Sequence, residues 1–172
     1  IATANAIIYN NSNPVFIDIS EDFNIDVRKI LKFLNTQTKK KNNFLFNKKT
    51  NRRIIAIMVV HVFGNPVKDL FKIKKLCKKY SIKLIEDAAE GIGSYIFKNK
   101  KKKHIGFIGD FSCFSFNANK VITAGAGGMI YCKSKKDFNF AKYLSSTAKD
   151  KSYNFTHNEC GYNYRITNLH SA

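Results

Sequence analysis

Two charged side chains lie in segments whose composition suits a chemical role. Asp87 ends the apolar run LIED at 84–87, and Lys120 is the only basic residue between positions 105 and 132. A carboxylate at the end of a buried strand costs free energy unless it meets a cation. A lysine in dry surroundings favours the neutral amine, which is the form that condenses with an aldehyde. Taken singly, Asp87 also suits a helix N-cap or an ion pair, and Lys120 also suits an ordinary surface position.

A glycine-rich stretch, AGAGG at 124–128, follows Lys120. Glycines let the backbone turn sharply or approach a ligand closely. The spacing is neither GxGxxG nor GxxxxGK[ST], which excludes the common nucleotide-binding fingerprints.

The histidines and cysteines show no metal-ligand spacing. The four cysteines form no CxxC pair and are widely separated: Cys77, Cys113, Cys132 and Cys160. We therefore expect no metal site, and reduced thiols that act as small apolar residues in a cytoplasmic protein.

The elements that must position these residues alternate between strand and helix patterns. Short apolar runs predict strands at 15–18, 54–60, 82–85, 94–97, 111–116 and 128–132. Helical spacing predicts helices beginning after Asp26, over 66–80 and over 136–148, with a lysine-rich loop at about 36–52. Strands separated by helices indicate an α/β fold with a largely parallel sheet. Ligands bind beyond the carboxyl ends of such strands, which directs attention to Asp87 and to the loops after Val60 and Phe116.

Composition narrows the class of protein but does not decide the function. The 172 residues are 44% hydrophobic, enough for one domain with a core. The longest apolar run, 54–60, is far shorter than the roughly twenty residues of a membrane-spanning helix. The formal net charge of +18 raises the alternative of a basic nucleic-acid-binding module, but the lysines form separate clusters and no RNA- or DNA-binding motif is present.

Several motifs together resemble the DegT/DnrJ/EryC1/StrS family of sugar aminotransferases. The matching segments cover nearly the whole chain: ATANAI at 2–7, PVFID at 14–18, HVFGNP at 61–66, IEDAAEGIGS at 85–94, GDFSCFSFNANKVITAGAGGM at 109–129 and GYNYRITNLHSA at 161–172. The resemblance implies the three-layer large domain of a fold type I aminotransferase and the cofactor pyridoxal 5′-phosphate. Family members are about twice as long, so we expect residues 1–172 to be part of the large domain, without an N-terminal segment and the small domain.

The resemblance also implies a role for individual residues. Lys120 corresponds to the lysine that holds the cofactor through an imine bond and then moves the proton between substrate and cofactor. Asp87 corresponds to the partner of the pyridine nitrogen, and Ser115 to a ligand of the cofactor phosphate. Asn163 corresponds to an asparagine that reaches the phosphate from a neighbouring subunit, which implies a homodimer with a shared active site. Glu90 lies beside the ring hydroxyl, where the family more often has glutamine.

The same resemblance predicts the reaction. Lysine at position 120 favours transamination over the dehydration that relatives with histidine there carry out. The segment HNECGYNYRITN at 157–168 resembles the subgroup that aminates 4-keto-6-deoxy-N-acetylhexosamines on the way to bacillosamine- or legionaminic-type sugars. The expected substrates are therefore a nucleotide-linked keto-deoxysugar and an amino-acid donor, with glutamate as the expected donor. A 3-keto sugar aminotransferase is the alternative within the class, and a non-catalytic remnant is a further one.

Overall fold

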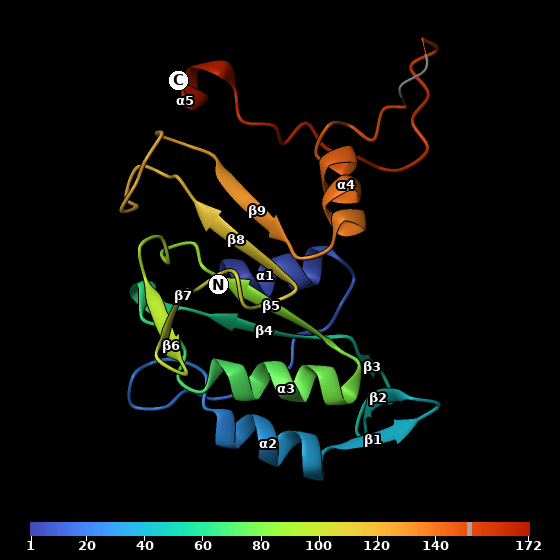
Figure 1. Ribbon diagram of the computed structural model, residues 1–172. Helices are drawn as coiled ribbons and strands as arrows, with labels where there is room; N and C mark the ends of the chain where they lie inside the picture. Colours follow the sequence, from blue (N-terminus) through green and yellow to red (C-terminus); the bar gives the residue numbers. More distant parts are fainter. Residues whose placement is uncertain (151–152) are drawn as a thin grey trace.

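The computed structural model describes residues 1–150 and 153–172, and these form a mixed α/β structure (Figure 1). The helices are α1 (Ala2–Tyr9), α2 (Val27–Thr36), η1 (Val62–Gly64), α3 (Leu70–Tyr80), α4 (Lys135–Leu144) and α5 (Asn168–Ser171). The strands are β1 (Thr38–Lys41), β2 (Phe44–Asn47), β3 (Arg53–Ile54), β4 (Ala56–Val60), β5 (Lys83–Asp87), β6 (Tyr95–Lys98), β7 (Lys101–His104), β8 (Phe111–Ser115) and β9 (Gly128–Cys132).

The central sheet has the strand order β4-β5-β8-β9. β4, β5 and β8 are parallel, whereas β9 returns antiparallel to β8. The register places Val60 beside Asp87, and Asp87 beside Cys113. The predicted α/β class is therefore confirmed, and the parallel strands end at a common edge of the sheet.

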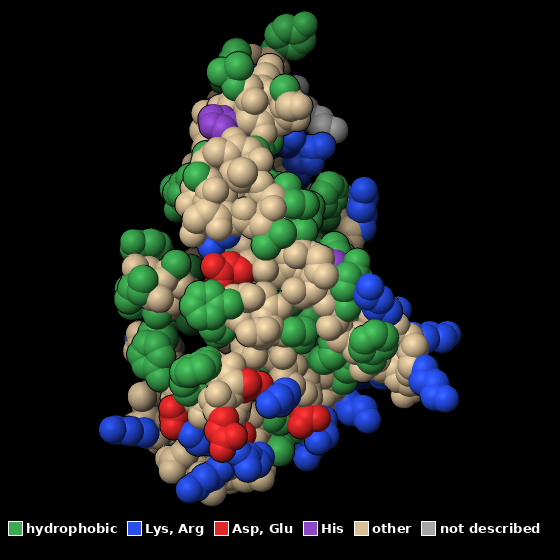
Figure 2. All heavy atoms as spheres, turned by 90° about the vertical axis from the view of Figure 1, so that its left-hand side faces the viewer, with side chains coloured by type: hydrophobic (Ala, Val, Ile, Leu, Met, Phe, Trp, Pro, Cys, Tyr) green, Lys and Arg blue, Asp and Glu red, His purple; other side chains and the backbone are tan. Residues whose placement is uncertain are grey.

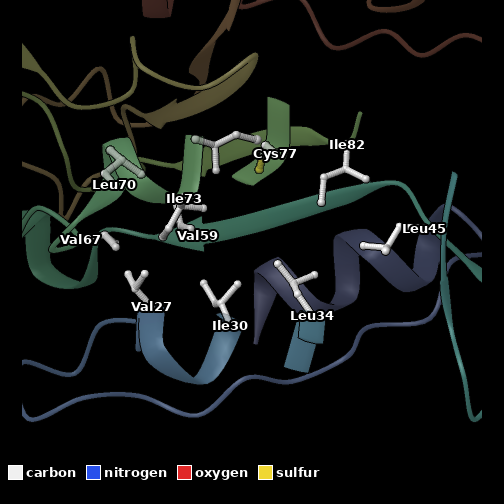
Figure 3. Close-up of a cluster of buried hydrophobic side chains, with 11 residues drawn as sticks. Val27, Ile30, Leu34, Leu45, Val59, Val67, Leu70, Ile73, Cys77 and Ile82 are labelled. Atoms are coloured by element: carbon white, nitrogen blue, oxygen red, sulfur yellow. The ribbon is translucent and has the colours of Figure 1, made fainter. Parts of the chain in front are cut away.

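The main core lies between the sheet and two stacked helices. α3 packs against the sheet, and α2 lies beyond α3 (Figure 1). Figure 3 shows the side chains that fill this space: Val27, Ile30 and Leu34 of α2, Leu70, Ile73 and Cys77 of α3, with Val59, Val67, Ile82 and Leu45 around them. The helical spacing predicted after Asp26 is confirmed, and Asp26 caps α2 by accepting a hydrogen bond from the Arg28 amide at 2.8 Å.

The prediction of a lysine-rich loop at 36–52 is wrong, because β1 and β2 form an antiparallel hairpin there. Asn42 and Asn43 make the turn with φ of 48° and 64°. Asparagine tolerates this left-handed conformation better than most residues, and two such residues in succession suit a tight hairpin turn. β6 and β7 form a second hairpin through Asn99 and Lys100, with φ of 50° and 62°.

Four other predicted elements differ from the structure. Residues 15–18 form no strand, because the only pairing nearby is an isolated bridge from Ile19. The run 54–60 is divided between two sheets, because β3 pairs in one sheet and β4 in another, and Ile55 between them is 56% exposed. The helix predicted from Pro66 begins only at Leu70, after a left-handed Asp69, and the helix predicted over 136–148 ends at Leu144.

Candidate active site

The carboxyl ends of β4, β5 and β8 lie at one edge of the sheet, on the left of Figure 1. Figure 2 views this face directly and shows hydrophobic side chains in its middle, whereas most of the acidic side chains lie in the lower part among lysine and arginine side chains, which also extend along the right side. The loops that follow these strands carry His61, Glu90 and Lys120. Ligands bind beyond the carboxyl ends of parallel strands, so this edge is the expected position of a ligand site, and the sequence motifs indicated the same edge.

Asp87 is the last residue of β5 and has hydrogen-bond donors but no cation around it. Its Oδ2 accepts a hydrogen bond from Thr3 Oγ1 at 2.6 Å, and its Oδ1 accepts one from the Ala89 amide at 3.2 Å. Among the described residues, no basic side chain forms an ion pair with Asp87, and Asp87 caps no helix. Neither of the two ordinary roles considered for Asp87 is realised, and its carboxylate is available to a cationic ligand.

Thr3 is a site residue that the sequence did not single out. It lies in the first turn of α1, 84 residues before Asp87, and its hydroxyl orients one oxygen of that carboxylate. The ATANAI segment contributed to the family resemblance, but no local pattern marks Thr3 as a partner of Asp87. Only the packing of α1 beside the end of β5 brings them together.

Lys120 and Glu90 form an ion pair across the loops that follow β8 and β5. Lys120 Nζ lies 3.1 Å from Glu90 Oε1, and the two side chains are 16% and 35% exposed. The other oxygen, Glu90 Oε2, accepts a hydrogen bond from the Phe63 amide at 3.0 Å. The expected covered environment of Lys120 is present, and it contains the Glu90 carboxylate as the partner of the lysine.

Ser115 and Asn163 have other partners. Ser115 is the last residue of β8, and its hydroxyl accepts a hydrogen bond from the Asn117 amide at 3.2 Å. Asn163 is exposed and forms an isolated bridge with Ser146 in the segment after α4. Its predicted reach into a neighbouring subunit stays a prediction, as does the phosphate contact of Ser115.

The glycine-rich stretch shapes the loop that carries Lys120. Gly125 and Gly127 have φ of 80° and 97°, a conformation that favours glycine. A Cβ on Gly128 would lie 2.5 Å from the Phe114 carbonyl oxygen, so β9 could not approach β8 with a larger residue there. The stretch thus closes the turn from β8 into β9.

His61 and Glu86 form a buried pair of side chains next to the residues at the ends of β4 and β5. Both side chains are fully buried, and His61 Nε2 lies 3.0 Å from Glu86 Oε2. His61 Nδ1 accepts a hydrogen bond from the Val67 amide at 3.1 Å, so Nε2 carries the proton and donates it to Glu86. Glu86 also accepts hydrogen bonds from the amides of Gly106, Ile108 and Gly109. One carboxylate therefore connects the loop after β4 with the segment that enters β8.

The hydrogen bonds to Glu86 determine its ionisation. Burial alone opposes the charged form, but the hydrogen bonds from His61 and from the amides of Gly109 and Gly106 outweigh it, so the pKa of Glu86 is lowered from its ordinary 4.5. A lowered pKa in the folded state stabilises the protein above the ordinary value, and this stabilisation is lost as the pH falls through the lowered value.

Replacing Glu86 with glutamine should destabilise the protein by about 2–4 kcal/mol at pH 7. The glutamine amide directs a donor at groups that are themselves donors, so at least one buried N–H loses its acceptor. Urea unfolding at pH 7 and at a series of pH values below 4.5 measures the effect, and the difference from wild type should shrink as the pH falls through the lowered pKa of Glu86. A difference that stays constant down to the lowest pH at which the wild type is folded contradicts the assignment of Glu86 as a buried, charged acceptor.

The cysteines are not uniformly the small core residues that we expected. Cys77 is buried in α3, whereas Cys113 and Cys160 are exposed and Cys132 is intermediate. Cys113 Sγ lies 3.7 Å from Asp87 Oδ1. Desolvation of the thiol, together with the Asp87 charge, raises the pKa of Cys113 to about 11, so the thiol stays protonated beside the carboxylate.

Two structural findings concern other classes of function. Within residues 1–150 and 153–172, no group of three or more histidine, cysteine or acidic side chains is arranged to hold a metal ion. No helix in the same ranges has the length and apolar character that a bilayer crossing requires.

The fold and the strand-end residues define an α/β protein in which the amine of Lys120 and the carboxylate of Glu90 meet at the carboxyl edge of a parallel sheet. The chain belongs to the DegT/DnrJ/EryC1/StrS aminotransferase family, whose model matches residues 1–172. This finding confirms the predicted family. Its members depend on pyridoxal phosphate.

Similar proteins support the same assignment. The chain is 35% identical over 170 residues to the putative pyridoxal phosphate-dependent aminotransferase EpsN of Bacillus subtilis, covering 98% of this chain and 40% of that protein. It is 36% identical over 173 residues to UDP-4-amino-4,6-dideoxy-N-acetyl-beta-L-altrosamine transaminase of Campylobacter jejuni, covering 99% and 41%. A solved structure, Helicobacter pylori PseC, an aminotransferase involved in the biosynthesis of pseudoaminic acid, matches with a TM-score of 0.81 and 28% identity, covering 99% and 41%. The chain thus spans about two fifths of the length of these relatives.

Proposed function

We propose that the protein carrying this chain is a pyridoxal phosphate-dependent aminotransferase that acts on a nucleotide-linked keto-deoxysugar. The observation that supports it most is the arrangement at the carboxyl edge. Within the part of the chain that the structure describes, Asp87 has no ion-pair partner there, and Lys120 comes from the loop after the neighbouring strand and pairs with Glu90, three residues after Asp87. A primary amine and a carboxylate are the two groups that an aldehyde-bearing pyridine ring requires.

The residues at this edge fit the family's cofactor by their chemistry. Lys120 supplies the amine, Asp87 an anion for the ring nitrogen, and Ser115 a hydroxyl for the phosphate. The bound cofactor would accept the electrons released when a proton leaves the amino-bearing carbon. Lys120 would move that proton, while the Thr3 hydrogen bond keeps the Asp87 carboxylate in place.

The relatives and the motif at 157–168 support a more specific proposal for the substrate. We propose a 4-keto-6-deoxy-N-acetylhexosamine linked to a nucleotide, with glutamate as the amino donor. The Campylobacter relative is named for an amino sugar with an N-acetyl group and a 4-amino group, which supports this class. We further propose that residues 1–172 form part of the large cofactor-binding domain and that the active site is completed in a homodimer.

Transfer of isotope from [15N]glutamate tests the proposal directly. The protein is incubated with pyridoxal phosphate and with UDP- or GDP-linked 4-keto and 3-keto sugars, and the products are analysed by mass spectrometry. We expect 15N in a 4-amino-6-deoxy-N-acetylhexosamine nucleotide. Incorporation only at carbon 3 contradicts the proposed position of amination, and no incorporation into any sugar of the panel contradicts the proposed substrate class.

A further inference from the structure

The loops after β4, β5 and β8 meet at one side chain, that of Glu90. Its Oε1 lies 3.1 Å from Lys120 Nζ, and its Oε2 accepts the hydrogen bond from the Phe63 amide at 3.0 Å. The Glu90 main chain also lies close to Gly64 in the loop after β4: its carbonyl oxygen is only 2.6 Å from the position that a Cβ on Gly64 would take. One carboxylate therefore connects the loop that carries Lys120 with the loop that carries Phe63.

Phe63 has a conformation that needs such support. Its φ of 51° and ψ of 30° lie in the left-handed region, which is disfavoured for a bulky side chain, and the residue is 82% exposed. A strained residue persists only where its surroundings hold it. The side-chain acceptor on Glu90 satisfies the Phe63 amide and contributes to holding it.

The backbone around Lys120 is ordered separately from its side chain. The Lys120 amide donates to the Asn117 carbonyl at 3.0 Å, and the Phe116 amide donates to the Gly127 carbonyl at 2.9 Å. These bonds place the loop but leave four rotatable bonds between the Lys120 backbone and its ammonium. Among the described residues, Glu90 is the only acidic side chain that pairs with Lys120.

We propose that Glu90 is a positioning residue for Lys120. Its carboxylate holds the lysine ammonium beside the end of β5 while no aldehyde is bound, and couples that position to the loop at Phe63. An amide at position 90 could still accept the bond from Phe63 but carries no charge to hold the ammonium. The importance of this contact for the reaction rests on the proposed function, whereas the contact itself can be tested without the reaction.

The test compares wild type with Glu90→Gln in the cofactor-free protein. Each lysine is acetylated with a limiting amount of acetic anhydride at pH 8, and mass spectrometry gives the rate at each site. Glu90 restrains the Lys120 side chain in an ion pair, and breaking that pair frees the lysine to react, so we expect the rate at Lys120 to rise about two- to fivefold, the range that the loss of one partly exposed ion pair produces. An unchanged or lower rate at Lys120 overturns the proposal.

A matched variant and a second measurement make the test specific. Asp18→Asn removes the same charge from another ion pair, with Lys29, and should raise acetylation at Lys29 but not at Lys120. A rise at Lys120 in both variants would indicate a general charge effect and overturn the proposal. Amide exchange at Phe63 should be unchanged in Glu90→Gln and faster in Glu90→Ala, and equal exchange in both contradicts the coupling of the two loops.

The test of the Glu90 contact can fail or succeed independently of the test of the proposed function. Borohydride reduction of the wild-type protein with pyridoxal phosphate shows independently whether Lys120 forms a covalent link. If the link forms but the acetylation of Lys120 does not respond to Glu90→Gln, the positioning role is wrong and the proposed function stands. If no link forms although acetylation responds, the proposed function is wrong and the positioning role stands.

Discussion

Replacing Lys120 with arginine should abolish covalent attachment of pyridoxal phosphate and all measurable transamination. Arginine keeps the positive charge and the donors that pair with Glu90, so the loops around the site should keep their arrangement. Its guanidinium stays protonated and is a poor nucleophile for an aldehyde. The loss of proton transfer alone should lower turnover by about 10²–10⁴-fold.

Absorbance and mass spectrometry measure this result. Wild-type protein mixed with pyridoxal phosphate and reduced with borohydride should carry the added mass on the peptide that contains Lys120, whereas the arginine variant should carry none there. Circular dichroism of the variant serves as the control for folding. A reduced adduct on another lysine in the wild type, or wild-type turnover in Lys120→Arg, contradicts the assignment.

Replacing Asp87 with asparagine should lower turnover by about two to three orders of magnitude, the range seen when one preorganised charge-stabilising group is removed. Asparagine has nearly the same shape and can still accept the hydrogen bond from Thr3. It carries no negative charge, and so it does not favour a protonated ring nitrogen. The effect should therefore fall on turnover and leave covalent attachment at Lys120 intact.

Thr3→Val is the matched comparison for Asp87→Asn. It removes the hydroxyl that orients the carboxylate but keeps the charge, and one hydrogen bond of this kind contributes about 0.5–1.5 kcal/mol, so its effect should stay near tenfold. Steady-state turnover and the yield of reduced adduct are measured for both variants. Equal losses in the two variants would show that the charge of Asp87 is not the property that matters.

The edge of the sheet that carries the candidate site was predictable from the sequence where local chemistry and strand order were sufficient. The apolar runs before Asp87 and before Lys120 predicted two strands, and those strands are neighbours in the parallel part of the sheet. The ends of neighbouring parallel strands meet at one edge, so the two loops had to be close. The family resemblance, confirmed by the match over residues 1–172, then gave each residue a role.

The partners of these residues were not predictable in the same way. Thr3 contacts Asp87 from the other end of the sequence, and Phe63 supplies its backbone amide to Glu90, a group that every residue except proline carries. The strand predicted at 94–97 is present as β6, but the hairpin of β1 and β2 and the strand β7 escaped prediction for a related reason. β1 and β7 are short and rich in lysine, and the turns of both hairpins depend on pairs of residues in the left-handed conformation rather than on an apolar pattern.

The sequence by itself determined the α/β class, because hydrophobic periodicity is a local property, and the family resemblance supplied the proposed roles of Lys120 and Asp87. Only the tertiary structure decided which groups surround them: the Thr3 hydroxyl and, among the described residues, no ion-pair partner at Asp87, and the Glu90 carboxylate at Lys120. These contacts join residues that are 30 to 84 positions apart in the chain, and they exist only when the fold brings the elements that carry them together.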